Sequence, residues 1–173
     1  MNSPAPSDRE AFFPENEIIV SKTDLKGRLT YCNKTFCHVA GYREAELLGK
    51  PHSLVRHPDM PRAVFKLLWD TLEARREVFA YVKNMTKSGD FYWVFAHVTP
   101  SFARDGTVVG YHSNRRAPKR AAIDRVIAPL YAEIRAAEAQ HKNGKEALAA
   151  GVACLTQTLA ALKVSYEQFV LTV

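Results

Sequence analysis

The stretch that decides the fold reads FYWVFAHVTP and occupies residues 91–100. It is dense in aromatic and β-branched residues, which favour β-strands. The turn sequences KSGD at 87–90 and RDGT at 104–107 bound it on both sides. Residues 78–86 and 108–114, beyond these turns, also have strand composition. The pattern predicts a three-stranded antiparallel meander.

Upstream of the meander, the sequence predicts a β-hairpin and then short helices. Residues 17–23 and 29–32 have strand composition and are separated by a glycine turn. Asn33 is a suitable N-cap for a first helix, 43–48 predict a second, and 63–74 carry the clearest apolar stripe. Together these elements predict an α+β fold: a five-stranded antiparallel sheet with short helices over one face. The groove between the two layers is the expected ligand cavity.

After Pro118 the pattern becomes helical. Apolar residues recur at alternating spacings of three and four, which is the period of a narrow helical seam. Asn143-Gly144 is predicted to be a left-handed stop between two helices, the second of which runs to the C-terminus. Gly151 is expected to weaken that second helix by roughly 1 kcal/mol relative to alanine. The seam suits either a hairpin folded onto its own domain or a dimeric coiled coil.

These patterns divide the chain into three parts. Residues 1–16 are rich in proline and serine and predict a flexible N-terminal arm. Residues 17–117 form the α+β domain, and 118–173 form a helical segment for signalling or dimerisation.

The composition is that of a soluble globular protein: 47% of the 173 residues are hydrophobic and 24% are charged. The net charge of +6 is interspersed, and the one dense basic cluster, Arg115 to Arg120, lies at the expected domain boundary. Without a basic face interleaved with aromatic residues, this charge does not indicate a nucleic-acid partner. No phosphate loop, nucleophile–base pair or metal-ligand cluster is evident, so we expect no enzyme.

The sequence also carries signals about the cellular compartment of the protein. The N-terminus has no secretory apolar core, and the three cysteines lack metal or redox spacing. The most apolar stretch is shorter than the ~20 residues that a membrane-spanning helix needs. We therefore expect a cytoplasmic protein that reaches a membrane only through a partner.

The densest chemistry lies in VRHPDMP, residues 55–61. Its prolines fix their own φ angles and keep the preceding residues out of the helical region, so the polar side chains project from a stiff loop. Arg56 offers a planar donor fork suited to phosphate or carboxylate. Asp59 could orient that fork or accept a hydrogen bond from a ligand. The alternative interpretation is a solvated turn in which Asp59 and Arg56 only stabilise the loop.

Four blocks of sequence resemble the PAS family, with matching spacing over roughly residues 17–116. They are TDLKG at 23–27, NKTF at 33–36 with Gly41-Tyr42, LGKPH at 48–52 through RHPDMP at 56–61, and VKN at 82–84 with KSGDFYWV at 87–94. Within that family, the RHPDMP run resembles the flavin-binding sensor domains of Aer-type aerotaxis receptors.

This resemblance implies non-covalently bound FAD and a domain that reports redox or oxygen status. Carried over residue by residue, it implies flavin contacts from Asn33, Arg56, His57, Asp59, Phe65, Trp69 and Asn84. Arg56 and His57 suit the pyrophosphate or ribityl oxygens, and the two aromatic residues supply stacking surface. The Asn84 amide has a donor and an acceptor for the edge of the ring.

One position departs from the family pattern. Aer-type domains usually carry a tryptophan early on the strand that bears Asn84, whereas this chain has Val78 followed by Phe79. Because side chains alternate along a strand, Phe79 is expected to face away from the cavity.

Two other functions are compatible with the sequence. A haem-binding gas sensor could use a histidine, with His52 and His57 the leading candidates and His97 and His112 on strands. A ligand-free PAS module could act through contact alone, with the C-terminal helices mediating dimerisation. For the sensor, the expected partners are a second copy of the chain and a chemoreceptor or kinase.

Overall fold

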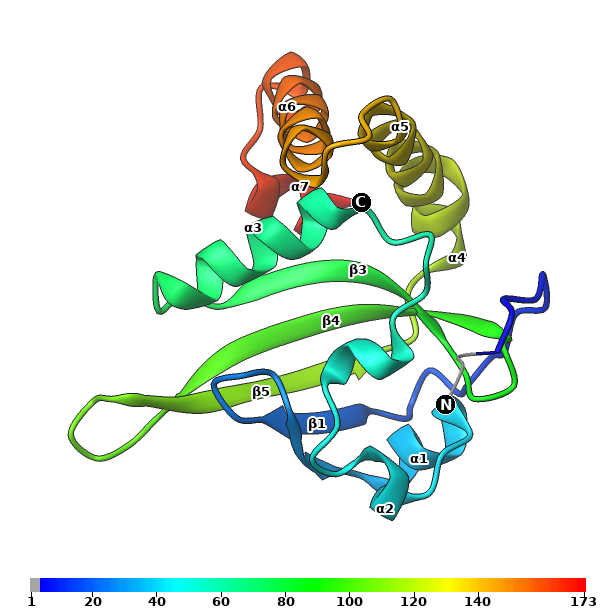
Figure 1. Ribbon diagram of the computed structural model, residues 1–173, viewed down its shortest axis with the longest axis vertical. Coiled ribbons are helices and arrows are strands. Elements are labelled where there is room, and N and C mark those ends of the chain that lie inside the picture. The colour runs from blue at the N-terminus through cyan, green and yellow to red at the C-terminus, as the bar shows by residue number, and fades with distance from the viewer. Residues whose placement is uncertain (1–3) are drawn as a thin grey trace.

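The structure is a computed structural model and describes residues 4–173. A five-stranded antiparallel sheet with strand order β2-β1-β5-β4-β3 lies at its centre (Figure 1). The strands are β1 (Ile19–Thr23), β2 (Leu29–Cys32), β3 (Val78–Met85), β4 (Phe91–Phe102) and β5 (Val108–Arg116). The predicted α+β fold and its meander are confirmed.

The segment between β2 and β3 covers one face of this sheet (Figure 1). It contains α1 (Lys34–Ala40), α2 (Glu44–Leu47), the 3-10 turn η1 (His52–Val55) and α3 (Arg62–Glu73). Asn33 is the predicted N-cap of α1, since its side chain accepts a hydrogen bond from the Phe36 N–H at 3.0 Å. Several core side chains of the sheet and its covering segment are at most 1% exposed, among them Ile19, Leu29, Phe36, Leu47, Val55 and Val64.

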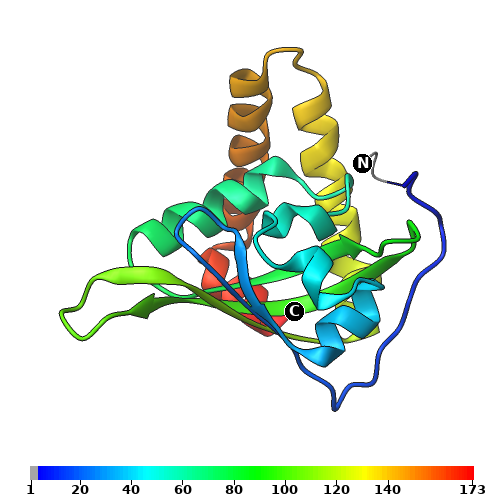
Figure 2. The same ribbon diagram turned by 60° about the horizontal axis from the view of Figure 1, so that its bottom comes forward.

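The chain after β5 forms a helical hairpin at the β3 edge of the sheet (Figures 1 and 2). Its elements are α4 (Arg120–Ala122), the π-helical turn η2 (Ile123–Ile127), α5 (Ala128–Ala139), α6 (Gly144–Leu162) and α7 (Tyr166–Thr172). α5 packs along α6, α6 contacts α3, and α7 contacts β3. The Tyr131 hydroxyl donates to the Tyr81 carbonyl of β3 at 2.6 Å. Of the two arrangements left open by the sequence, the hairpin on its own domain is the one observed.

Two predicted details of the hairpin are wrong. Asn143 does not stop α5 in a left-handed conformation; it has φ −76° and caps α6 by accepting from the Lys145 and Glu146 N–H groups. The last helix is also not continuous, because Lys163 adopts a left-handed φ of 56° and Ser165 begins α7. Asparagine serves at either end of a helix, and serine followed three residues later by glutamine is a capping box.

The N-terminal segment runs beside the turn between β3 and β4. Arg9 forms an ion pair with Asp90 at 2.6 Å, and Glu10 pairs with Phe91 as an isolated bridge. The first three residues of the predicted arm, 1–3, lie outside the described residues.

No single helix between residues 4 and 173 is long and apolar enough to cross a membrane. Only α6 and α7 taken together pass that test by length and composition, and they are bent by 73°.

Candidate functional site

A cavity of about 280 Å³ lies between the sheet and α3, where the layered fold predicts it. Its apolar wall consists of Phe65, Leu68, Trp69 and Leu72 of α3 with Val82, Ala96 and Val98 of the sheet. Its main polar groups are Ser21, Thr23, His52, Ser53, Arg56, Asn84, Tyr111, Ser113 and Arg115. Apolar walls with a few convergent polar groups are typical of a small-molecule site.

The charges around this cavity are one-sided. Lys26, Arg56 and Arg115 line it, and none of the lining residues that the structure describes is acidic. A cleft lined by one sign of charge attracts ligands of the opposite sign. The lining therefore suits an anionic ligand.

Arg56 is held at the cavity by the proline-rich loop. Its guanidinium lies 4.0 Å from the centre of the Phe65 ring and donates to the Met60 carbonyl at 3.3 Å. Its backbone pairs with Asn84 as an isolated antiparallel bridge, which fixes the loop to β3. Burial lowers the pKa of Arg56 from its usual value.

Asn84 lies on β3 and is 3% exposed. Its side-chain Nδ2 makes no hydrogen bond of normal geometry among the described residues, and the hydroxyl of the neighbouring Tyr92 on β4 is also unpaired. An unpaired buried donor costs about 1–3 kcal/mol. A ligand acceptor in the cavity would remove that cost.

Trp69 forms part of the cavity wall near the surface. It is 37% exposed and packs edge-to-face against Tyr111, with ring centres 5.4 Å apart. Across from it, a Cβ on Gly27 would lie 3.5 Å from the indole, so the β1–β2 turn and α3 approach each other here.

Three of the seven predicted contacts do not line this cavity. The Asn33 amide is used within the fold: Oδ1 accepts from the Val20 and Phe36 N–H groups and Nδ2 donates to the Ile18 carbonyl. His57 faces a separate hollow, and its Nδ1 accepts from the Asp59 N–H at 3.1 Å. Asp59 forms ion pairs with Lys83 at 2.8 Å and Arg135 at 2.7 Å. The structure thus brings Arg56, Phe65, Trp69 and Asn84 together at one cavity, and flavin contact by each of the seven residues stays a prediction.

Comparison with known proteins agrees with this geometry. The sequence profile of the PAS fold matches residues 29–115. The chain belongs to the PAS family. It is 42% identical over 124 residues to the aerotaxis receptor of Escherichia coli (strain K12). The aligned region makes up 70% of this chain and 24% of the receptor.

Other relatives of this PAS domain are also sensors or regulators by name. The nitrogen fixation regulatory protein of Klebsiella pneumoniae is 29% identical over 99 residues, or 57% of this chain and 20% of that protein. A blue-light-activated histidine kinase of Brucella anthropi is 24% identical over 102 residues, or 59% and 18%. The chain therefore spans about a quarter or less of the length of these relatives.

Solved structures share the fold. A light-oxygen-voltage domain studied with a flavin analogue has a TM-score of 0.57 and 17% identity, covering 67% of this chain and 87% of that one. The dark structure of the Aureochrome1 light-oxygen-voltage domain has a TM-score of 0.55 and 18% identity, covering 67% and 85%. At such identities the likeness shows the fold alone.

The PAS cavity contains a group that we call the inner arginine cluster: Ser21 of β1, His52 of η1 and Arg115 of β5. The sequence singled out only His52 of these, as a candidate haem ligand, and did not place Ser21 or Arg115 in the site. Arg115 is 2% exposed, donates to the Ser21 hydroxyl and approaches His52 Nε2 at 3.2 Å. In the sequence it looks like a member of an exposed basic cluster. The register of β5 separates it from Arg116, which is exposed on the opposite face.

Burial controls the charges in this cluster. It lowers the pKa of His52 to about 3, with the neighbouring Arg115 charge adding to the effect. It also lowers the pKa of Arg115 to about 10, so the guanidinium stays charged at neutral pH. Since Arg115 has only donors, His52 Nε2 must be the unprotonated nitrogen of a neutral ring.

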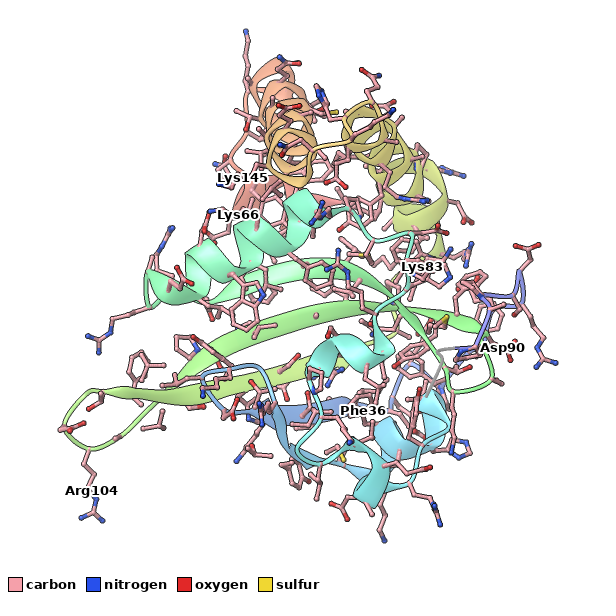
Figure 3. All side chains as sticks on the ribbon, in the orientation of Figure 1. Phe36, Lys66, Lys83, Asp90, Arg104 and Lys145 are labelled. Atoms are coloured by element: carbon pink, nitrogen blue, oxygen red, sulfur yellow. The ribbon has the colours of Figure 1, made fainter. Side chains whose placement is uncertain are left out.

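The RHPDMP loop also meets the C-terminal helices, on the side away from the cavity. We call this surface the helix interface, and it consists of Asp59, Lys83 and Arg135, with Glu138 and Gly151. Figure 3 shows Lys83 beside the loop that precedes α3. Glu138 is 8% exposed and accepts from the Arg62 and Ala63 N–H groups at 3.1 and 2.9 Å, which caps α3. A Cβ on Gly151 would lie 2.5 Å from Glu138 Oε1. The glycine expected only to weaken α6 therefore makes room for this cap.

The departure at Val78 has the predicted consequence. Phe79 faces away from the cavity, where its ring stacks on His97 with centres 4.3 Å apart. Val78 packs with Leu68 and Leu72 in a small apolar cluster. At this position the PAS domain thus has an aliphatic side chain packed against α3.

Proposed function

We propose that this PAS domain binds a flavin non-covalently in the cavity and reports the redox state of that flavin to a signalling partner. The observation that carries the proposal is an apolar cavity that combines an unpaired Asn84 Nδ2 with cationic groups and, among the residues described, no lining carboxylate. A flavin ring has apolar faces and an edge of hydrogen-bonding groups. The walls match the faces, and the Asn84 amide matches the edge.

Within this proposal, direct flavin contact falls to Arg56, Phe65, Trp69 and Asn84. The cavity of about 280 Å³ is near the lower end of small-molecule sites, so it suits the ring system better than a whole dinucleotide. We propose FAD because the RHPDMP loop places the Arg56 cation beside the cavity. With the flavin ring inside the cavity, the pyrophosphate of FAD would extend toward this cation and could bind it. His57 and Asp59 would act by holding that loop.

A bound flavin would supply a reversible change of charge and protonation at its ring. The Asn84 side chain can answer such a change because an amide offers either a donor or an acceptor when it turns over. Asn84 is bridged to Arg56, and Asp59 of the same loop is paired with Arg135 of α5. β3 is also bonded to α5 through the Tyr131 hydroxyl. These contacts form the proposed output path.

The partner is proposed from the relatives. An aerotaxis receptor and a histidine kinase contain similar domains, so we propose a chemoreceptor or a kinase as the signalling partner. We further propose that the chain acts in the cytoplasm, catalyses no reaction itself and works as a dimer.

The first experiment is an absorption spectrum of the purified protein, followed by release and chromatography of any cofactor. A two-band flavin spectrum with FAD released is the expected result. Asn84→Ala should weaken FAD binding about tenfold, the value of a buried hydrogen bond. Asn114→Ala is the matched control, because Asn114 lies on β5 and hydrogen-bonds His112 at 3.1 Å.

Two results would overturn the proposal. A colourless protein that takes up no added FAD would favour the ligand-free module. A Soret band would favour haem with His52, the one histidine among the described residues that lines the main cavity. That result would require His52 to leave its contacts with Ser21 and Arg115.

A further inference from the structure

Two cysteines meet where β2 leads into α1. Cys32 is the last residue of β2, and Cys37 lies in α1. Their sulfurs are 3.7 Å apart, which is direct contact. Both are free thiols. Their separation in the chain is not a redox spacing, so only the fold reveals that they form a pair.

The cap of α1 holds these two cysteines in place. Asn33 is the N-cap, so Cys32 precedes the cap and Cys37 is the fourth residue of the helix. Side chains at these two positions often pack together as a hydrophobic staple. The Cys37 N–H donates to the Asn33 carbonyl at 3.2 Å, and the Asn33 N–H donates to the Val20 carbonyl at 3.0 Å. Since the backbone is fixed, side-chain rotation is the movement that brings the sulfurs to the roughly 2 Å of a disulfide.

The two thiols differ in their access to solvent. Cys32 is 4% exposed, and burial raises its pKa to about 12, with the hydrogen bond to Cys37 adding to the effect. Cys37 is partly exposed. A thiol reacts with an oxidant as its thiolate, and only where the oxidant can reach it. Cys37 is therefore the thiol that meets a dissolved oxidant, and Cys32 is the neighbour placed to react with the product.

We propose that Cys32 and Cys37 form a redox switch, in which hydrogen peroxide oxidises Cys37 and an intramolecular disulfide follows. The Cys37 thiolate attacks one peroxide oxygen and the O–O bond breaks, which gives a sulfenic acid, while the hydroxide that leaves takes the thiol proton to form water. The Cys32 sulfur then attacks the Cys37 sulfur. The S–S bond forms, the S–O bond breaks, and the hydroxyl leaves as water with the Cys32 proton. In sum, two thiols are oxidised to one disulfide and one peroxide is reduced to two waters.

This switch does not rest on the proposed flavin, but a disulfide here would act on the same cavity. Cys32 pairs with Ser21 of β1, and Ser21 lines the cavity. At the other end of α1, the Ala40 carbonyl accepts from the Lys87 N–H of the β3–β4 turn at 2.8 Å. Joining Cys32 to Cys37 would therefore tie β2, α1 and this turn into one unit. Disulfides that form in reducing compartments are usually transient, catalytic or redox-sensing, which fits a switch.

The test treats the purified protein with hydrogen peroxide and maps its thiols. We expect the free thiols to fall from three to one and the intact mass to fall by two hydrogens, with dithiothreitol reversing both changes. Trypsin cuts after Lys34, so the disulfide would join two peptides, 29–34 and 35–43, in mass spectrometry. The oxidised protein should also resist urea better, with a folding equilibrium constant roughly 10- to 100-fold larger, the effect of closing a short loop.

Cys154→Ser is the matched control. Cys154 is also a partly exposed thiol, and it lies on α6, at the opposite end of the molecule from α1 (Figures 1 and 2). This variant should form the same bridge as the unaltered protein. Cys37→Ser should form none, and peroxide should leave its resistance to urea unchanged. If Cys37→Ser does not fold, the peptide map of Cys154→Ser still decides the outcome, because that variant contains only the two cysteines of the pair.

Three results would overturn the proposal. The first is a Cys37 that gains oxygen atoms while Cys32 stays a thiol. The second is a disulfide between two chains in place of the one within a chain. The third is bridging that proceeds equally fast in urea, since the contact between the two sulfurs in the folded protein would then contribute nothing.

Discussion

The inner arginine cluster and the helix interface lie on opposite sides of the same loop and differ in how their charges are balanced. At the helix interface, Asp59 has two cationic partners and Glu138 accepts from two backbone N–H groups. In the inner cluster, Arg115 meets only neutral groups. Asp59 and Glu138 are thus satisfied where the fold joins its own segments, whereas Asn84 Nδ2 and Arg115 Nε, at the cavity, have no partner among the described residues.

This difference teaches how stability and function are divided in the molecule. A satisfied buried group stabilises the native state, whereas an unpaired one lowers its stability until a ligand arrives. The loop connects the two regions, since Arg56 faces the cavity and Asp59 faces α5. A displacement of the loop at one region can therefore alter the contacts at the other.

The largest expected effect at neutral pH is at the helix interface. Glu138→Ala leaves the first two N–H groups of α3 without an acceptor, and should lower the free energy of unfolding by about 2–3 kcal/mol. The sign of the stability change caused by Gly151→Ala tests the close contact between Gly151 and Glu138. Alanine favours a helix by about 1 kcal/mol over glycine, yet its Cβ would lie 2.5 Å from Glu138 Oε1, so we expect destabilisation.

In a Glu138→Ala background the same Gly151→Ala change should stabilise the protein, because the crowded carboxylate is gone. Urea unfolding of the two single variants and the double variant measures this. A stabilising Gly151→Ala in the unaltered chain would show that the close contact does not hold Glu138 in place.

The second effect is a pH dependence from the inner cluster. The pKa of His52 is about 3 in the fold against an ordinary value of 6.5. Between these values the unfolded chain binds a proton that the folded protein excludes. The stability that the neutral His52 contributes is therefore fully present above pH 6.5. It is lost as the pH is lowered, by up to about 1.4 kcal/mol for each pH unit.

His52→Gln should make this slope shallower, and urea unfolding over a pH series measures it. Burial also lowers the pKa of His57, which contributes in the same direction. Equal slopes in the variant and the unaltered protein would mean that His52 is not held neutral by the cluster.

The smallest effect is expected at Asp59, although it has two ion pairs. Its side chain is 40% exposed, and exposed pairs contribute about 0–1 kcal/mol because solvent screens them. Asp59→Asn should lower stability by less than about 1 kcal/mol, and added salt should reduce the difference. Asp70→Asn, which removes the surface pair with Lys66, is the matched control. A loss of several kcal/mol would place Asp59 among the main supports of the fold.

Much of the fold was predictable because its signals are local. Strand composition between glycine turns predicted the meander, and the capping role of Asn33 predicted the start of α1. The break at Lys163 was missed because apolar spacing continues across it, and Asn143 was misjudged because asparagine suits both ends of a helix. In the cavity, the resemblance supplied Arg56, Phe65, Trp69 and Asn84.

The sequence by itself determined the α+β architecture, the position of the cavity between its layers and the residues on one side of it. Only the tertiary structure decided that Arg115 is buried and Arg116 exposed, since two adjacent identical residues differ only in the register of β5 beside β1. It also decided that Gly151 and Glu138 meet across α5 and α6 to cap α3. The physical reason is that propensity and capping act between neighbours in the chain, whereas burial of a charge depends on which distant segments surround it.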